Sequence, residues 1–214
     1  MIPEIRNQIG REEFDHQTLL DTLRSYARPR DKISDLLRKG IILRVKKGLY
    51  IFGRDYRRGG HYSRELLANW IYGPSYVSLE FALQHYGMIP EWVKAVTSVT
   101  IGRSKRFHTP VGLFIYRQIP MAAFRIGMTR ETVDKETSFL IATPEKALAD
   151  KVRDDRGTGV QSRSQMMTYL LEDLRVDETA LRDLDAEQLG RIGQRYHSRK
   201  IRLLAEVVRL WKGA

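Results

Sequence analysis

The chain has 214 residues, of which 42% are hydrophobic and 29% charged, a balance typical of folded globular proteins and unlike that of disordered chains. It contains no cysteine, which excludes disulfides and thiolate metal sites, and its five histidines lack the spacing typical of metal ligands. The sequence shows no apolar run long enough for a membrane span and no signal peptide at its start, so we expect a cytoplasmic protein without a membrane partner, metal or cofactor.

The charge of the chain is strongly positive and unevenly distributed. The formal net charge is +11, and residues 24–58 hold twelve Lys and Arg against three acids, a difference of +9. Such a surface attracts the phosphate backbone of nucleic acids, and acidic lipids are a second class of anionic partner. We therefore expect a nucleic-acid partner, with a purely solubilising charge as the alternative.

The first predicted helices flank a proline. Residues 16–26 carry leucines at the spacing of one helical face, with Asp15 placed to cap the helix. Pro29 interrupts the pattern and is well suited to the first turn of a second helix, predicted over residues 30–39, which Gly40 ends. Ile33, Leu36 and Leu37 form its inward face.

A hairpin with a basic tip is predicted next. Residues 41–45 and 49–52 are β-prone, and Lys46-Lys47-Gly48 joins them, with a glycine that tolerates positive φ. Helix, turn, helix and hairpin is the order of a winged helix-turn-helix, in which the second helix enters the major groove and the hairpin lies along the backbone. The predicted DNA-binding residues are Arg28, Arg30, Lys32, Ser34, Lys39, Arg44, Lys46, Lys47, Arg57 and Arg58.

The predicted fold class is α+β, with a winged helix-turn-helix domain over residues 1–58 and a larger mixed domain over residues 61–214 that ends in helices. The glycine-rich stretch 53–60 is interpreted as a flexible linker. Helices are predicted at residues 64–72 and 78–86, the second capped by Ser78, and strands at 95–101, 112–119 and 137–142. Thr143, Pro144 and Glu145 predict a strong helix start, and three helical stretches are expected after residue 162.

The enzymatic alternative is a Mg²⁺-dependent nuclease guided to DNA, which needs carboxylates and a lysine converging on one phosphate. The pairs Glu145-Lys146 and Asp150-Lys151 are adjacent on one predicted helix, so we expect them to face solvent rather than converge. The sequence therefore predicts a protein that is not an enzyme. A protein-binding adaptor with an incidental basic surface is the other alternative.

Two further groups of residues bear on binding. Arg191, Arg195 and Arg199 are spaced by four and predict a basic stripe along one helix, which suits either DNA contact or a solvated helix face. Trp70, Trp92 and Trp211 are far apart in the sequence, and we expect them in the core rather than in a base-stacking platform.

Several segments resemble a known family. ISDLLRKGIILRVKKGLYIF at residues 33–52 is similar to the helix, wing and closing aromatic of AbiEi-type antitoxins, and PSYVSLEFALQHY, GLFIYRQIP and IATPEKALADKV continue the similarity to about residue 150. The resemblance implies a regulator that represses its own promoter in a phage-defence (abortive infection) toxin-antitoxin operon. It also implies a neighbouring nucleotidyltransferase-like toxin as functional partner, without implying direct contact.

Overall fold

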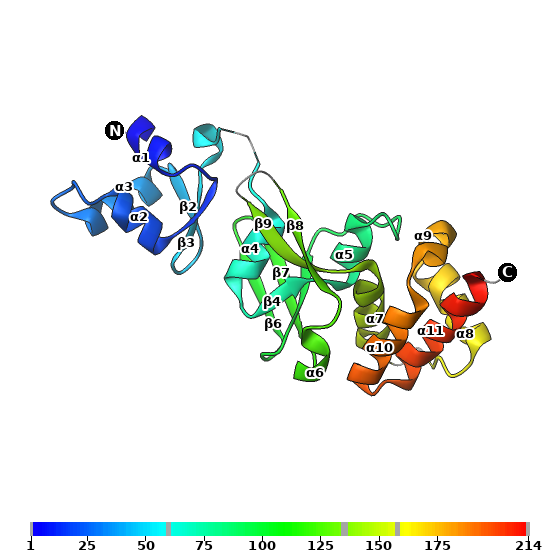
Figure 1. Cartoon of the computed structure of the whole chain (residues 1–214). Helices are drawn as coiled ribbons and strands as arrows, with labels where there is room; N and C mark the ends of the chain where they lie inside the picture. The colour runs from blue at the N-terminus through cyan, green and yellow to red at the C-terminus, as the bar shows by residue number, and fades with distance from the viewer. Residues whose placement is uncertain (1, 59–60, 134–136, 157–158, 213–214) are drawn as a thin grey trace.

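The computed structural model describes residues 2–58, 61–133, 137–156 and 159–212 and shows a mixed α+β fold. In Figure 1 an N-terminal unit lies on one side of a large sheet, and the C-terminal helices lie on the other. Within the described ranges, no helix has the length and apolar character that crossing a membrane requires.

The N-terminal unit combines helices with a small antiparallel sheet whose strand order is β1-β3-β2. Its elements are α1 (Ile2–Gln8), β1 (Glu13–Asp15), α2 (His16–Thr22), α3 (Pro29–Arg38), β2 (Ile42–Lys46), β3 (Leu49–Phe52) and the 3₁₀ helix η1 (Arg54–Tyr56). Asp15 caps α2 as predicted, accepting from the Thr18 amide at 2.8 Å. The helix ends at Thr22, earlier than expected, and Pro29 occupies the first turn of α3.

All four residues of β3 are buried, which requires both faces of the strand to be covered. Tyr50 and Phe52 belong to a hydrophobic cluster built from the helices and strands of the N-terminal unit. Leu49 and Ile51 point to the opposite face, because side chains alternate along a strand, and they belong to the large cluster that continues through the rest of the chain. The small sheet is therefore packed between its own helices and the following part of the protein.

The predicted flexible linker is ordered over its described residues. Gly53 donates to the Ile41 carbonyl at 2.8 Å, and its α-carbon lies so close to Gly40 that a β-carbon would meet the Gly40 carbonyl oxygen. Residues 54–56 then form η1. Residues 53–58 thus have a defined turn and hydrogen bonds where a flexible connection was expected, while residues 59–60 lie outside the described part.

The larger sheet has six strands in the order β6-β7-β5-β4-β9-β8, with β4 parallel to β9 and β5 parallel to β7. Its strands are β4 (Ser75–Val77), β5 (Val96–Thr100), β6 (Lys105–Thr109), β7 (Gly112–Gln118), β8 (Met128–Thr132) and β9 (Ser138–Ala142). The accompanying helices are α4 (Arg64–Ile71), α5 (Leu79–His85), α6 (Met121–Phe124) and α7 (Pro144–Asp154). The predicted strands correspond to β5, β7 and β9.

The C-terminal helices pack beyond α7 in Figure 1. They are α8 (Arg163–Thr168), which continues into a π-helical turn η2 (Tyr169–Asp173), α9 (Glu178–Asp183), α10 (Ala186–Tyr196) and α11 (Arg199–Lys212). His197 adopts a left-handed conformation at the end of α10, with φ of 50°. The predicted single stripe is therefore wrong, because Arg191 and Arg195 lie on α10 whereas Arg199 begins α11.

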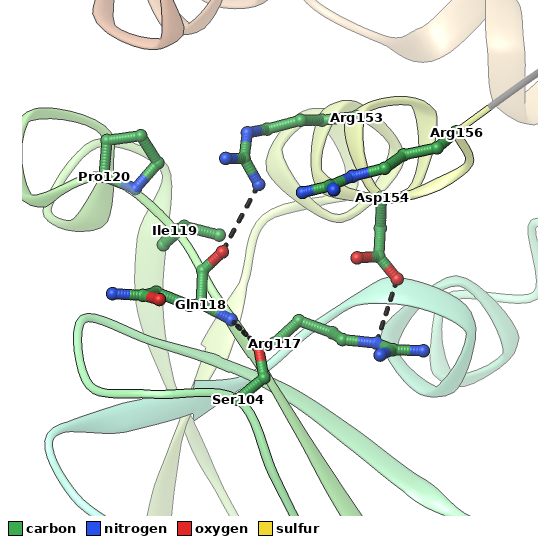
Figure 2. Close-up of a pocket in the computed structure, with 8 residues that line it drawn as sticks. All are labelled: Ser104, Arg117, Gln118, Ile119, Pro120, Arg153, Asp154 and Arg156. Carbon is green, nitrogen blue, oxygen red and sulfur yellow. Dashed lines mark hydrogen bonds and ion pairs between the residues drawn. The ribbon is translucent and has the colours of Figure 1, made fainter.

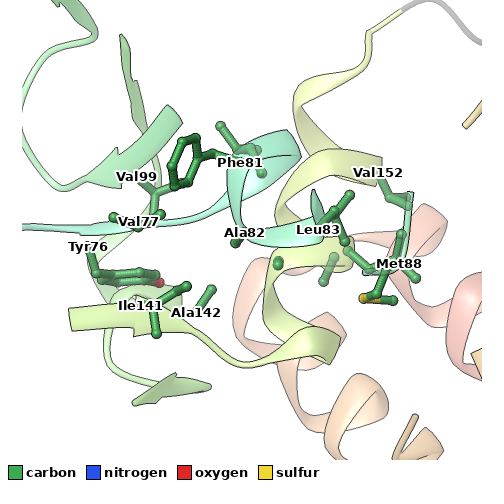
Figure 3. Close-up of a cluster of buried hydrophobic side chains, with 14 of the residues drawn as sticks. Tyr76, Val77, Phe81, Ala82, Leu83, Met88, Val99, Ile141, Ala142 and Val152 are labelled. Atoms are coloured by element: carbon green, nitrogen blue, oxygen red, sulfur yellow. The ribbon is translucent and has the colours of Figure 1, made fainter. Parts of the chain in front are cut away.

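The core between sheet and helices is apolar. Figure 3 shows Tyr76 and Val77 of β4 and Ile141 of β9 in one buried cluster with the helical residues Leu83 and Val152. The prediction that the tryptophans belong to the core is wrong for Trp70 and Trp92, and Trp211 is half-buried outside the two core clusters. Trp92 is 76% exposed in the loop before β5, and Trp70 is 39% exposed on α4.

Helix α7 begins as predicted, with Thr143 as its side-chain cap, but it carries a buried ion pair. Lys146 and Asp150 are fully enclosed, so the expectation that they face solvent is wrong. The Lys146 ammonium donates to Asp150 and, at 2.7 Å, to the Tyr196 hydroxyl on α10. Ser78 donates to the second Asp150 oxygen at 2.7 Å, so its hydroxyl does not cap α5 as predicted.

The electrostatics of the pair follow from its burial. Burial lowers the pKa of Lys146 from its usual value, because the charged form loses its hydration, and Asp150 opposes this effect. A buried charge is tolerated only when it is paired and hydrogen-bonded. The pair is thus held in place by partners on the residue preceding α5 and on α10.

We expect Lys146→Ala to destabilise the protein by about 3–5 kcal/mol, because it leaves Asp150 buried without its cation. Urea denaturation followed by circular dichroism measures this change. The matched control is Arg163→Ala, which breaks the exposed pair between Arg163 and Glu206 and should cost less than about 1 kcal/mol. Equal effects of the two substitutions would contradict the importance of the buried pair.

Candidate nucleic-acid interface

Helix α3 begins without a side-chain cap. Its N-cap residue is Arg28, which makes no capping hydrogen bond, and Pro29 supplies the first turn. The first amide groups of a helix have no partner inside the helix, and together with the helix dipole they favour a nearby anion. Arg28 and Arg30 are exposed at this end, so the start of α3 presents cations and uncapped amides together.

Several basic residues of α3 are engaged with one carboxylate. Lys39 and Arg38 donate to Asp35 at 2.8 and 2.7 Å, and Lys32 lies 3.8 Å from it. The hydrogen bonds from Lys39 and Arg38 lower the pKa of Asp35 from 3.8 to about 2. Of the predicted DNA-binding residues, Lys32 and Lys39 therefore belong to a surface ion-pair network, which phosphate would have to compete with.

Lys32 is also more enclosed than predicted. Its side chain is only 15% exposed, and its ammonium lies 5.4 Å from the centre of the Tyr26 ring. The Ser34 hydroxyl, which is exposed, donates to the Arg30 carbonyl at 3.2 Å on the same helix. Ser34 therefore lies on the exposed face of α3, whereas most of the Lys32 side chain is covered.

Other cations of the N-terminal unit are exposed and without an ion-pair partner among the described residues. They include Arg30 in the first turn of α3, Arg44 on β2 and Lys47 in the turn between β2 and β3. Gly48 completes that turn with a φ of +83°, the left-handed conformation predicted for it. Arg28 is nearly as available, since its contact with Asp31 is 3.9 Å long and both side chains are largely exposed.

Lys46 is placed differently from Lys47. It is the last residue of β2 rather than part of the turn, and its ammonium donates to the Ile71 carbonyl at the end of α4. The same ammonium lies 5.1 Å from the centre of the Phe107 ring on β6. The prediction that Lys46 projects from a hairpin tip is therefore wrong, because this side chain holds the hairpin to the larger sheet and α4.

Arg57 and Arg58 make contacts inside the chain. Arg57 is half-buried, with its Nε donating to the Phe52 carbonyl at 3.0 Å and its guanidinium over the Tyr62 ring. The guanidinium of Arg58 donates to the Asn7 side chain. Of these two arginines only Arg58 is exposed, and both are engaged by groups of the same chain. Residues 57 and 58 therefore do not present two free cations for contact with DNA.

The sequence patterns did not reveal that Arg6, in the N-terminal unit, is buried. Arg6 is 5% exposed and pairs with Glu12, donates to the Ile9 carbonyl at 2.6 Å and lies over the Phe52 ring. Its Nε also donates to the Tyr56 carbonyl at 3.2 Å. Arg6 thus ties α1 to the segment after β3, and nothing in its local sequence distinguishes it from an exposed arginine.

A second contact connects the two parts of the protein. Glu13 on β1 is 3% exposed and accepts a hydrogen bond from the Ser63 amide just before α4. Burial raises the pKa of Glu13 above its usual value. This carboxylate and Lys46 join the small sheet to opposite ends of α4.

The buried position of Lys146 and Asp150 also bears on the nuclease alternative, because neither group is accessible to a phosphate. Among the residues that the structure describes, no group of three or more His, Cys, Asp or Glu side chains is arranged to hold a metal ion.

Comparison of the chain with protein-family models gives no match, and comparison with curated proteins gives none of significance.

Lys46 and Lys47 carry the same charge, but only the Lys46 ammonium donates to the Ile71 carbonyl. The two residues therefore make a matched pair for a stability test. We expect Lys46→Ala to cost about 1 kcal/mol, because it removes a charged donor from the Ile71 carbonyl, and to lower Tm by roughly 2–4 °C. Lys47→Ala should leave Tm within about 1 °C of wild type, as for other surface substitutions. Thermal melts of both variants measure this, and equal Tm values would contradict the contact.

Proposed function

We propose that this protein is a sequence-specific DNA-binding regulator and that residues 1–58 form a winged helix-turn-helix. The order helix, strand, helix, helix, hairpin, together with the strand order β1-β3-β2, supports this assignment. In this proposal α3 is the recognition helix and the β2–β3 hairpin is the wing.

The observation that carries the proposal is the distribution of unpaired cations. Arg30, Arg44 and Lys47 are exposed without ion-pair partners in the described part of the chain, and they lie on α3 and the hairpin. Many other basic residues of the N-terminal unit are held by carboxylates, carbonyls or rings. Cations left free on a recognition helix and a wing are those that a phosphate backbone would neutralise.

The proposed roles differ along this surface. Arg28 and Arg30, at the start of α3, are placed to contact base edges or the flanking phosphates, where the uncapped helix end favours an anion. Arg44 and Lys47 would contact backbone phosphates, which position the protein without reading sequence. Because Lys46 and Glu13 fasten the small sheet to α4, the wing would approach DNA in a fixed orientation relative to the larger sheet.

The proposal includes autoregulation in an antitoxin operon, which rests on the resemblance to AbiEi-type antitoxins. Two of the segments that carry this resemblance are neighbours in space: Val77 of β4 pairs with Ile141 of β9, and Ser78 donates to Asp150 of α7. The shared motifs thus contribute to one packed core. The regulated promoter would be the protein's own, and the functional partner a nucleotidyltransferase-like toxin encoded beside it.

The DNA-binding proposal predicts a steep salt dependence. Full-length protein is titrated by fluorescence anisotropy with duplex DNA from upstream of its own gene, and with a scrambled duplex, over a series of salt concentrations. Each neutralised phosphate contributes about 0.9 to the slope of log K against log salt, so three free cations predict a slope of about −3 or steeper. A flat dependence, or no binding to either duplex, would refute the proposal. Cleavage of the duplex on addition of Mg²⁺ would indicate the nuclease instead.

Variants separate recognition helix from wing. Arg30→Ala should reduce discrimination between the two duplexes by about 1–3 kcal/mol, the range of a good base contact. Lys47→Ala should weaken binding to both duplexes equally and reduce the salt slope by about one. The control is Arg209→Ala on the exposed side of α11, which removes the same charge and should change neither quantity. Equal losses in all three variants would indicate attraction by net charge alone.

The antitoxin part is tested by a promoter reporter. Co-expression of the protein should repress a reporter driven by its own upstream DNA, and Arg30→Ala should relieve the repression. Derepression should be absent with Arg209→Ala. DNA binding in vitro without repression in cells would separate the DNA-binding proposal from the autoregulatory one.

A further inference from the structure

A hollow of about 580 Å³ lies where β7 and α7 both end, away from the N-terminal unit. Figure 2 shows the residues around it. They are Ser104, Arg117, Gln118, Ile119, Pro120, Arg153, Asp154 and Arg156. In Figure 1, α7 and α3 lie on opposite sides of the larger sheet, so the hollow is not part of the surface formed by α3 and the hairpin.

The charge of this pocket is unbalanced. Arg117, Arg153 and Arg156 line it together with a single carboxylate, Asp154, which pairs with Arg117 at 3.1 Å. Arg153 and Arg156 have no carboxylate partner among the residues that the structure describes. Like charges that share a concave site repel each other, and a bound anion would relieve this repulsion.

Two of the arginines are held in position before any ligand arrives. Arg153 donates to the Gln118 carbonyl at 3.3 Å and lies over the Tyr196 ring, 5.2 Å from its centre. Arg117 is fixed by Asp154 through Nε, which leaves its terminal amino groups available. Guanidinium groups that are already ordered lose less entropy when they bind an anion.

The remaining lining supplies a neutral donor and an apolar wall. The Ser104 oxygen accepts from the Gln118 amide at 2.9 Å, so its own hydrogen is available to donate. In Figure 2, Ile119 and Pro120 lie on the side of Gln118 that is away from Ser104. Such a combination suits a ligand with a charged head and a less polar remainder.

We propose that this pocket binds a small molecule carrying a diphosphate group. Arginine pairs with phosphate through two parallel hydrogen bonds, and several arginines around one space match an anion with more than one phosphate. The volume lies within the range of roughly 300–1,000 Å³ that small-molecule sites occupy. A concave site suits a compact ligand better than a continuous DNA backbone. This inference is independent of the proposed DNA binding at α3.

Isothermal titration calorimetry of the full chain with inorganic pyrophosphate, at constant ionic strength in chloride buffer, tests the proposal. Adenosine diphosphate is titrated in parallel, and inorganic phosphate distinguishes a diphosphate site from a general anion site. We expect saturable binding of pyrophosphate, tighter than that of phosphate by about tenfold. Saturable binding of adenosine diphosphate would extend the site to nucleotides, and its absence would restrict it to smaller diphosphates.

Charge variants within the pocket sharpen the test. Arg156→Gln should weaken pyrophosphate binding by about tenfold, the scale of one charge-assisted hydrogen bond. Asp154→Asn should strengthen it by about threefold or more, because it removes the competing carboxylate. Arg209→Gln removes one positive charge on α11 outside the pocket and should leave the affinity unchanged. Circular dichroism melts confirm that each variant is folded.

Three results would overturn the proposal. One is the absence of saturable pyrophosphate binding to folded protein. Another is an equal loss in Arg156→Gln and Arg209→Gln, which would indicate attraction by net charge. The third is an Arg156→Gln variant that binds pyrophosphate normally but binds duplex DNA less tightly, since the pocket would then belong to a nucleic-acid surface.

Discussion

The burial of β3 on both faces is the constraint on which the arrangement of the molecule depends. Tyr50 and Phe52 close the core of the N-terminal unit, while Leu49 and Ile51 enter the core of the larger part. Burial of large apolar side chains contributes about 1.5–3 kcal/mol each, so exposing either face would be costly. An N-terminal unit held in this way presents α3 and the hairpin as parts of a single body, rather than as a domain on a free tether.

Net charge alone is a poor guide to which cations face a partner. Asp35 engages the basic residues near the end of α3, Ile71 and Phe107 engage Lys46, and Arg6 is buried with Glu12. Cations left exposed without such partners among the described residues include Arg30 at the start of α3 and Arg44 and Lys47 of the hairpin. The same reasoning distinguishes the hollow at the end of β7, because there three arginines share one open depression with a single carboxylate, Asp154.

Local signals in the sequence predict local structure, and they succeed where a side chain acts on its own backbone. Asp15 and Thr143 cap helices, Pro29 starts α3, and Gly48 turns the hairpin, all as the sequence indicates.

Strands β6 and β8 escape prediction because they are the edges of the six-stranded sheet, where one side meets solvent and polar residues such as those of KRFHT and MTRET are favoured. Lys146 and Asp150 escape it because the charged side of a helix is assigned to solvent by default, and only the packing of α10 and α5 against α7 encloses them. For the basic residues proposed to bind DNA, local sequence does not reveal the contacts inside the chain, because Lys46 is engaged by Ile71 and Phe107 and Arg57 by Phe52 and Tyr62.

Helix α4 connects the larger sheet to the N-terminal unit, and it does so largely through its backbone. The Tyr116 hydroxyl of β7 donates to the Ala68 carbonyl at 2.6 Å, and Lys46 donates to the Ile71 carbonyl one turn later. The Ser63 amide, just before the helix, donates to Glu13. Carbonyl and amide groups are present whatever side chain a position carries, so substitutions on the exposed face of α4 leave these contacts intact. The position of the hairpin relative to β7, and hence to the arginine pocket at its end, is therefore set by the path of the α4 backbone and by a few donors and acceptors on either side of it.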